Sequence, residues 1–285
     1  MKKTMSIILV VVLAAFAAAF LCIDKSQKDS AFPPKGEALR LATYNVGVFH
    51  KSGEDMTSEI AAMMRELDAD VLSLNELDSC NTRNDCFQLA DFCSQMGEWR
   101  YRFSKTIDFR DGSYGIGVAF RPTLDSLYSL TYVLPKGDGP EDRVASIVAF
   151  PSFVFISTHL DHTSAAARSL QIRSITDFVS EHFASSTQPV FLCGDFNAKL
   201  SSEEMQSMLA DWTLLSPTEE MTASIPAGSL GTYPADAPNR IIDYIFVFKN
   251  GASCRVTGGG ICTHFDSADV TVTSDHLPVY VDVVF

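Results

Sequence analysis

The sequence has no short-period repeat and no low-complexity block, which excludes collagen, a coiled coil and a disordered tail protein. Cysteine is sparse, with 7 residues in 285, so the chain is not a disulfide-dense miniprotein. Positive charge is also in deficit, because 22 Lys and Arg stand against 35 Asp and Glu, for a net charge of −13. No run of Lys or Arg supplies the roughly six phosphate contacts that tight duplex binding needs. Nucleic-acid binding by surface charge alone is therefore disfavoured, whereas an active site that reaches a phosphate through a bound cation is not.

The N-terminal residues form a separate segment. Lys2 and Lys3 precede an apolar run over residues 5–23, as in the n-region and h-region of a secretory signal peptide. The run is also near the ~20 residues that span a bilayer, so an uncleaved membrane anchor is the alternative. We therefore expect a signal peptide or anchor at 1–23, a linker at 24–38 and a body at 39–285 that is exported. The protein is then secreted or periplasmic, or held at the membrane by the anchor.

Export puts the body in a compartment where disulfides persist. Cys80 and Cys86 flank a polar loop and could pair, as could Cys254 and Cys262 around a run of glycines. The sequence leaves this connectivity open. No spacing of His and Cys resembles a zinc site.

Strand and helix patterns alternate along the whole body. Alternating or continuous apolar runs predict strands at residues 39–43, 71–74, 115–120, 127–134, 144–150, 153–158, 190–193, 241–248 and 279–285. Helical spacing predicts helices that begin near Thr57 and contain Leu89 or Ile172, and Ser201 with Glu204 predicts a capping box at the start of another. Because several strands meet in hairpin-like turns, we expect one α/β domain with mostly antiparallel sheets faced by helices.

Polar side chains lie at the ends of these apolar runs. Such positions are rigid and can aim side chains into a shared cleft. The residues at or just after a strand end are Asn45, Glu76, His159, Asp195, Asn197, Asp275 and His276, and Asp243 lies inside a strand. If the strands pack side by side, these groups converge.

Their chemistry is coherent. Glu76, with Asn45 and Asp275, offers hard oxygen ligands that suit Mg²⁺ or Mn²⁺ rather than zinc. Asp243 can fix the tautomer of His276 through a hydrogen bond. Asp195 can then orient or deprotonate a water molecule that attacks a phosphate.

Each motif alone also has a structural explanation. An Asp-Phe-Asn sequence after a strand is often a turn, and a lone His159 is often a structural histidine. Residues 274–276 can be a plain loop. Asp243 is harder to explain in this way, because a carboxylate inside a buried strand must find a partner or lose its charge. The order and completeness of the set favour a site.

The order of these motifs resembles the endonuclease/exonuclease/phosphatase superfamily, which includes pancreatic-type deoxyribonucleases, abasic-site endonucleases, neutral sphingomyelinases and inositol polyphosphate 5-phosphatases. The matching segments are residues 43–45 (TYN), 74–76 (LNE), 113–115 (SYG), 158–161 (THLD), 194–197 (GDFN), 232–234 (TYP), 240–245 (RIIDYI) and 274–276 (SDH). The resemblance runs from about residue 39 to residue 285. It implies a four-layered α/β sandwich, with two central sheets flanked by helices, and a divalent-metal phosphoesterase.

The resemblance also implies a role for each site residue. The metal ligands would be Glu76, with Asn45 beside it, and Asp275 as a ligand or a supporting residue. The groups that act on phosphate and water would be Asp195 as base, Asn197 and Tyr114 on the phosphate, His276 supported by Asp243, and His159 at the leaving group or a phosphate oxygen.

The chain departs from the family pattern at Asn75, where many relatives have Gln. His162, Arg168 and Gln171 are candidates to line the substrate side, although a solvated helix face explains the last two equally well. Residues 99–103 (WRYRF) interleave basic and aromatic side chains, as a nucleic-acid surface does, but a half-buried strand gives the same alternation.

The sequence therefore predicts a monomeric, metal-dependent phosphoric ester hydrolase that acts outside the cytoplasm with Mg²⁺ or Mn²⁺. Its substrate is predicted to be a phosphodiester, in nucleic acid or in a small molecule. The alternative is an inositol phosphate or a sphingomyelin-like head group, cleaved by a phosphatase or a phosphodiesterase. A surface binding module without catalysis is a third hypothesis, disfavoured because all the chemical positions are filled.

Overall fold

The computed structural model describes residues 32–51 and 53–285. The predicted signal peptide or anchor at 1–23 and most of the predicted linker lie outside these residues. Within the described part of the chain, none of the helices has the length and apolar character needed to cross a membrane. Residues Lys35–Phe285 form one unit.

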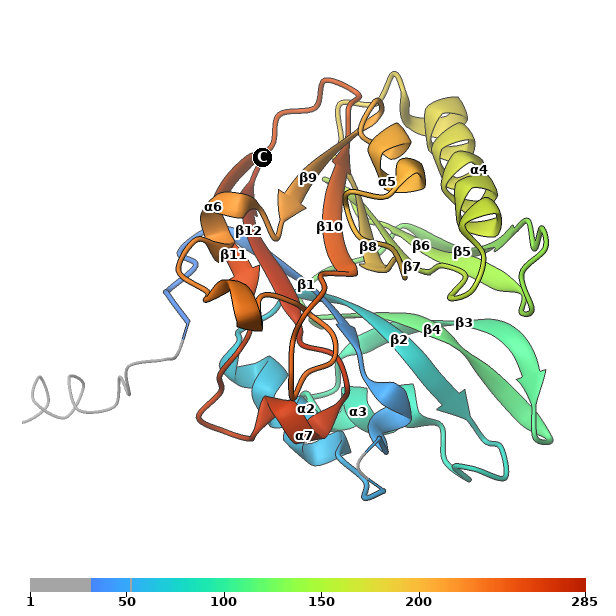
Figure 1. The fold of residues 1–285 in the computed structure, drawn as a ribbon, viewed down its shortest axis with the longest axis vertical. Coiled ribbons are helices and arrows are strands. Elements are labelled where there is room, and N and C mark those ends of the chain that lie inside the picture. The colour runs from blue at the N-terminus through green and yellow to red at the C-terminus, as the bar shows by residue number, and fades with distance from the viewer. Residues whose placement is uncertain (1–31, 52) are drawn as a thin grey trace, which may run out of the picture. The chain divides into compact units, whose positions relative to one another are not determined.

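The unit is built on two sheets of six strands each (Figure 1). Sheet 1 has the order β11-β12-β1-β2-β4-β3, and sheet 2 has the order β5-β6-β7-β8-β10-β9. The strands of sheet 1 are β1 (Leu39–Asn45), β2 (Val71–Ser79), β3 (Arg100–Phe109), β4 (Gly112–Phe120), β11 (Arg255–Ile261) and β12 (Val279–Val284). Those of sheet 2 are β5 (Tyr128–Leu134), β6 (Arg143–Ala149), β7 (Val154–His159), β8 (Val190–Asp195), β9 (Trp212–Ser216) and β10 (Asp243–Phe248).

Each sheet has a parallel pair at its centre and antiparallel partners outside it. The parallel pairs are β1 with β2 and β7 with β8. A helix connects the strands of each pair, as parallel pairing requires: α2 (Thr57–Glu66) in sheet 1 and α4 (Ala165–Phe183) in sheet 2. The predicted fold class, two mostly antiparallel sheets flanked by helices, is confirmed.

Helices cover the outer face of each sheet. In Figure 1, α2, α3 (Gln88–Gln95) and α7 (Val270–Thr273) lie on the side of sheet 1, and α4 and α5 (Glu203–Met208) lie on the side of sheet 2. A short helix, α6 (Glu219–Thr222), and two 3-10 turns, Gly47–Phe49 and Ala227–Ser229, complete the unit. The first turn of α4 is capped by Ser164, whose hydroxyl accepts the N–H of Ala167 at 3.0 Å.

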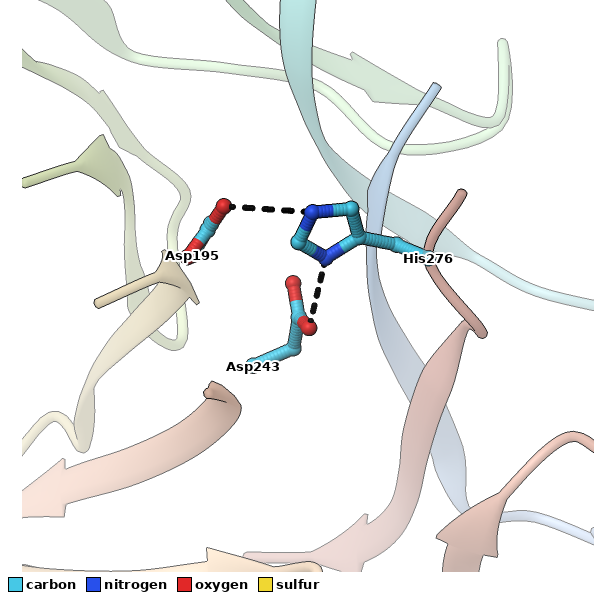
Figure 2. Close-up of side chains that lie close together, drawn as sticks. All are labelled: Asp195, Asp243 and His276. Atoms are coloured by element: carbon cyan, nitrogen blue, oxygen red, sulfur yellow. Dashed lines mark hydrogen bonds and ion pairs between the residues drawn. The ribbon is translucent and has the colours of Figure 1, made fainter. Parts of the chain in front are cut away.

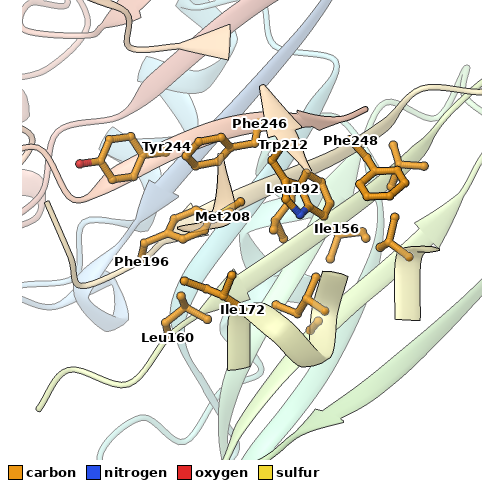
Figure 3. Packing of buried hydrophobic residues seen from close by; sticks show 14 of the residues in the cluster. Ile156, Leu160, Ile172, Leu192, Phe196, Met208, Trp212, Tyr244, Phe246 and Phe248 are labelled. Atoms are coloured by element: carbon orange, nitrogen blue, oxygen red, sulfur yellow. The ribbon is translucent and has the colours of Figure 1, made fainter. Parts of the chain in front are cut away.

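Apolar layers hold this arrangement together, and two of them involve sheet 2. One lies between the sheets and joins residues such as Leu41 and Val281 of sheet 1 to Phe155 and Phe191 of sheet 2. The other joins sheet 2 to α4 and α5, where Trp212, Phe246 and Phe248 pack with Ile172 and Met208 (Figure 3). Each side chain of this kind that is removed from water contributes roughly 1.5–3 kcal/mol.

Some predicted boundaries were wrong. The strand that begins at Val71 does not end at residue 74 but continues to Ser79, because its backbone bulges and then resumes pairing with β4. The helix predicted to start at Ser201 begins after Ser202, whose side chain makes no cap hydrogen bond, and the Glu204 carboxylate binds the Arg168 guanidinium at 2.9 Å. The Gly-rich β11 was not predicted, since glycine lacks the side-chain pattern that marks a strand.

The described cysteines are free thiols, so neither of the possible pairs is joined in this structure. Cys80 and Cys86 are exposed, and their backbones lie opposite each other, with the Cys80 N–H donating to the Cys86 carbonyl at 2.9 Å.

Candidate active site

The register of the strands brings the predicted site residues together. In sheet 1 Asn45 lies opposite Asn75, and in sheet 2 Asp195 lies opposite both His159 and Asp243. Both parallel pairs therefore end at the same edge of the sandwich. The carboxyl ends of parallel strands are where α/β folds place ligands, because several side chains project there without closing the sheet.

Glu76 reaches the site through a β-bulge. Leu74 pairs with Gly117 and Leu77 with Gly115, so two residues of β2 stand opposite one residue of β4. Glu76 has a φ of 60°, an unusual value for a residue other than glycine. In a regular strand the side chains of neighbouring residues point to opposite faces, and the bulge re-aims Glu76 so that it lies beside Asn45. This strained residue is at the candidate site, where such strain is most often found.

The amide of Asn45 connects the two sheets at this edge. Its Nδ2 donates to Glu76 Oε1 and to Asp195 Oδ2, both at 3.1 Å. Its Oδ1 accepts the N–H of Gly47 at 3.1 Å. The amide nitrogen, and not the oxygen, thus faces the two carboxylates. Asn45 in this orientation is a donor that holds Glu76 and Asp195 in position.

Asn75 makes a second connection directly beneath the site. Its Nδ2 donates to the Thr158 carbonyl at 2.9 Å, and its Oδ1 accepts the N–H of Asp195 at 3.1 Å. The side chain is completely buried. The shorter amide at this position therefore joins β2 to β7 and β8, and it fixes the distance between Glu76 and Asp195.

Asp195, Asp243 and His276 form a buried cluster (Figure 2). The Nδ1 of His276 lies 2.9 Å from Asp243 Oδ2, and its Nε2 lies 3.6 Å from Asp195 Oδ2. Burial opposes the charged imidazole, but the two carboxylate charges outweigh it and raise the pKa of His276 to about 10. Burial also raises the pKa of the Asp195 carboxyl, and the charge of Asp243 adds to this effect.

This cluster suits proton handling better than metal binding, although its atoms are close enough to hold an ion. A protonated histidine carries a hydrogen on each nitrogen and has no lone pair for a metal. The raised pKa of Asp195 gives a carboxylate that accepts a proton more readily than an exposed one.

His159 is the neutral counterpart of His276. Its Nε2 lies 3.5 Å from Asp195 Oδ2, and its buried Nδ1 has no hydrogen-bond partner among the described residues. Burial lowers the pKa of His159 well below its usual value, and the charges of Arg143 and His276 lower it further. His159 is therefore an uncharged group beside the base.

Four of these residues, Glu76, His159, Asp195 and His276, line one cavity of about 400 Å³. The side chains that line it are those of Lys51, Glu76, Tyr114, Glu141, Arg143, His159, His162, Asp195, Asn197, Tyr233, Arg240, Ile242, Asp275 and His276. The predicted residues Tyr114, Asn197 and His162 thus lie where phosphate or substrate would be bound. Burial raises the pKa of the Tyr114 phenol well above its usual value, and the charge of Glu76 adds to it, so Tyr114 remains a hydrogen-bond donor.

The chemistry of the cavity wall fits a hard cation. Glu76 and Asp275 both present carboxylate oxygens, and the buried Oδ1 of Asp275 has no hydrogen-bond partner among the described residues. The other oxygen of Asp275 lies 2.7 Å from the Lys51 ammonium, which leaves Oδ1 as the oxygen that a cation would bind. Oxygen ligands without thiolates suit Mg²⁺ or Mn²⁺.

The structure places Arg168 elsewhere. This predicted substrate residue is absent from the cavity wall, and its guanidinium binds Glu204 and the Asp161 carbonyl. Gln171 accepts the N–H of Asp161 and is buried, so it supports the loop after β7. Arg168 was chosen for its place on the helix after His159, and position along a helix does not reveal an ion pair with another helix.

Sequence reasoning missed Lys51, Glu141, Arg143 and Arg240, all of which line the cavity. Arg143 carried a usable signal, because it opens an apolar strand and a charged residue at such a position needs a partner. Arg240 opens the matching segment at residues 240–245 but was given no role, and Lys51 lies in a loop whose spacing carries no comparable information.

Comparisons with known proteins agree with this geometry. The model of the endonuclease/exonuclease/phosphatase family matches residues 42–276. A search of curated proteins finds no match. A solved mannosyl-6-phosphatase of Bacteroides thetaiotaomicron is similar in fold, with 22% identity, a TM-score of 0.69 and coverage of 87% of this chain and 100% of that chain.

Two further solved structures are from vertebrates. The human Nocturnin catalytic domain with bound sulfate has 17% identity and a TM-score of 0.61, over 89% of this chain and 100% of that chain. TDP2 from D. rerio, in complex with a single-stranded DNA product, has 16% identity and a TM-score of 0.65, over 87% and 100%. At these identities the likeness establishes the fold.

Proposed function

Because the chain belongs to the endonuclease/exonuclease/phosphatase family, we propose that it is a phosphoric ester hydrolase that depends on a divalent cation. One observation carries this proposal: most residues of the predicted set, from both sheets, line a single polar cavity. Glu76 and Asp275 would hold the cation, with Asn45 fixing the Glu76 carboxylate. When bound, a hard cation polarises the P–O bond and neutralises developing charge on the phosphate oxygens.

The chain's own residues supply the remaining steps. Asp195 takes a proton from a water molecule, and the Asn45 amide, which donates to its Oδ2, orients the carboxylate for this role. His276, fixed by Asp243, donates an N–H toward the phosphate oxygens. Asn197 and Tyr114 add donors from the cavity wall, while His159 lies at the leaving-group side.

The reaction is tested with the protein and generic phosphate esters. We expect hydrolysis with Mg²⁺ or Mn²⁺ that stops on addition of EDTA and returns with excess metal. The Glu76→Gln and Asp195→Asn variants should both lose turnover while keeping the wild-type circular dichroism spectrum. Hydrolysis that survives EDTA and both substitutions would contradict the proposal.

Two substrate classes fit the reaction. A nuclease was predicted, but the basic and aromatic stretch at residues 99–103 does not support it. Arg100 pairs with Asp125, and Phe103 packs edge-on against Phe87, as expected for a half-buried strand. A small phosphate ester is favoured by the three cationic side chains of Lys51, Arg143 and Arg240, which line a cavity of about 400 Å³. Plasmid DNA, RNA, inositol phosphates and sphingomyelin in one assay panel would rank these substrates.

We place this activity outside the cytoplasm. The support is the sequence of residues 1–23, with Lys2 and Lys3 before an apolar run. Fractionation of cells that express the full chain tests it. Recovery of a shortened protein from medium or periplasm indicates a cleaved signal, recovery of the full chain with membranes indicates an anchor, and a cytosolic full-length protein would contradict export.

A further inference from the structure

Arg143 stands out because it is a buried cation in the wall of the active-site cavity. It opens β6, which runs antiparallel to β7 with Ala145 opposite Thr158. The start of β6 therefore lies beside the end of β7, where His159 enters the site. Only 3% of the Arg143 side chain is exposed, and the guanidinium reaches the cavity shared with Glu76 and His276.

The protein itself uses few of the donors on this guanidinium. Nη2 donates to His162 Nδ1 at 3.1 Å and lies 3.3 Å from Glu141 Oε2. The Glu141 side chain is 38% exposed, so water weakens that attraction. The buried Nε has no hydrogen-bond partner among the described residues. Asp161 adds negative charge nearby, but its buried Oδ2 also lacks a partner there.

A buried cation with an unused donor is costly unless a ligand completes it. The guanidinium fork matches the oxygens of a phosphate and binds them in pairs. The Nδ1 of His162 accepts a hydrogen bond from Arg143, so a neutral His162 carries its hydrogen on Nε2. This N–H is available to an anion. An anion held here would lie beside neutral His159, whose pKa the charge of Arg143 helps to lower.

We propose that Arg143 and His162 form an anion subsite that selects phosphomonoesters over phosphodiesters. This inference rests on the proposed function. A monoester presents three non-bridging oxygens and up to two negative charges. A diester replaces one of those oxygens with an alkoxy group, which accepts hydrogen bonds poorly and brings bulk to a cavity of about 400 Å³. The third oxygen of the monoester is the group that the Arg143 fork binds.

The test compares two esters with the same leaving group, p-nitrophenyl phosphate and bis(p-nitrophenyl) phosphate. For Arg143→Gln we expect kcat/KM on the monoester to fall by about 10- to 100-fold, the range for a lost charge-assisted hydrogen bond. For the same variant, kcat/KM on the diester should change by less than about threefold, which is no more than the loss of a weak, exposed contact causes. Arg143→Lys should keep part of the preference for the monoester, because lysine retains the positive charge but not the fork of donors. Arg100→Gln, which removes an exposed cation outside the cavity, is the matched control and should leave both values unchanged.

Phosphate binding gives a second readout that does not require turnover. In calorimetry, inorganic phosphate should bind the wild type, and it should bind Arg143→Gln and His162→Ala more weakly. His162 is exposed, so its replacement should not disturb the core. His162→Ala keeps the test decisive if Arg143→Gln does not fold. Equal losses on both esters, or unchanged phosphate affinity in both folded variants, would overturn the subsite. If the wild type hydrolyses neither ester, the proposed function fails and calorimetry alone decides the subsite.

Discussion

Sheet 1 and sheet 2 share one strand arrangement but carry different chemistry at the edge where they meet the cavity. In each sheet a parallel pair is flanked by antiparallel partners, and both parallel pairs end at the site. Sheet 1 contributes Asn45 and Glu76, an amide and a carboxylate that suit a cation. Sheet 2 contributes His159, Asp195 and Asp243, which suit proton transfer. The common backbone plan thus supplies position, and a few side chains supply the reaction.

The resemblance extends to the last residues of β2 and to the turn after β7. The Asp78 N–H donates to the Gln88 side chain at 2.8 Å, and the Asp161 N–H donates to the Gln171 side chain at 2.9 Å. In both places the glutamine lies ten residues further along and belongs to the next helix. Each of these segments is thereby fixed to its helix, so the side chains before it are held rigidly at the cavity.

The largest expected effect is the loss of catalysis when one carboxylate of either sheet is replaced, with metal binding lost only for the residue of sheet 1. Glu76→Gln and Asp195→Asn should each lower kcat strongly, by about 10²–10⁴-fold for loss of a general base at Asp195. Only Glu76→Gln should also abolish Mn²⁺ binding, because only it removes a ligand. Calorimetric Mn²⁺ titration of both variants checks this. Equal metal affinity in the two variants would contradict the division of roles.

A smaller effect is expected at Asp243, which supports His276 from inside β10. In Asp243→Asn the imidazole loses its charged partner at 2.9 Å, and the pKa of His276 should fall toward its usual value. NMR titration of His276 should therefore show its proton lost at lower pH than in the wild type. An unshifted titration would mean that Asp195 alone maintains the charge on His276.

Asn75 tests whether the two sheets must be joined for catalysis. Asn75→Ala leaves the Thr158 carbonyl and the Asp195 N–H without their partner, which should cost about 1–3 kcal/mol of unfolding free energy. Loss of positioning around a metal site typically lowers activity by about 10–100-fold. Ser73→Ala removes another buried contact between the sheets, to Ser157, away from the site and serves as the control. Equal kcat losses in both variants would make Asn75 a purely structural residue.

The smallest expected effect is on stability in acid, through the carboxylates of Asp78 and Asp161. Hydrogen bonds from Arg83 and Asn84 outweigh burial and lower the pKa of Asp78, and backbone N–H groups do the same for Asp161. A lowered pKa stabilises the fold above the unfolded value near 3.8, and this stability is lost as pH falls through the folded value. Asp78→Asn should therefore be less stable than the wild type at neutral pH, with the gap closing below about pH 4. Urea unfolding across this range checks the sign, and a gap that widens in acid would contradict it.

The sequence predicted the fold and most of the site because both depend on short local signals. Apolar runs marked the central strands, and polar residues at their ends marked Asn45, His159 and Asp195. The continuation of β2 past Glu76 was not predictable, because a bulge is decided by pairing with β4. The orientation of the Asn45 amide depends likewise on Gly47 and two carboxylates that are distant in sequence or in another sheet.

Longer side chains were harder to place. Arg168 was assigned to the substrate side and instead binds Glu204, while Arg143 was not considered and lines the cavity. A guanidinium reaches far from its backbone, so its partner is set by tertiary packing. The sequence therefore predicted the shorter side chains of the cavity wall better than the guanidinium groups.

The most direct test of the account is a crystal structure of the protein soaked with Mn²⁺, with anomalous diffraction used to locate the ion. We predict one strong peak beside the Glu76 carboxylate, in the cavity that Asp195 and His276 also line. A peak confined to the cluster of Asp195, Asp243 and His276, or a cavity that stays empty at millimolar Mn²⁺, would contradict the account.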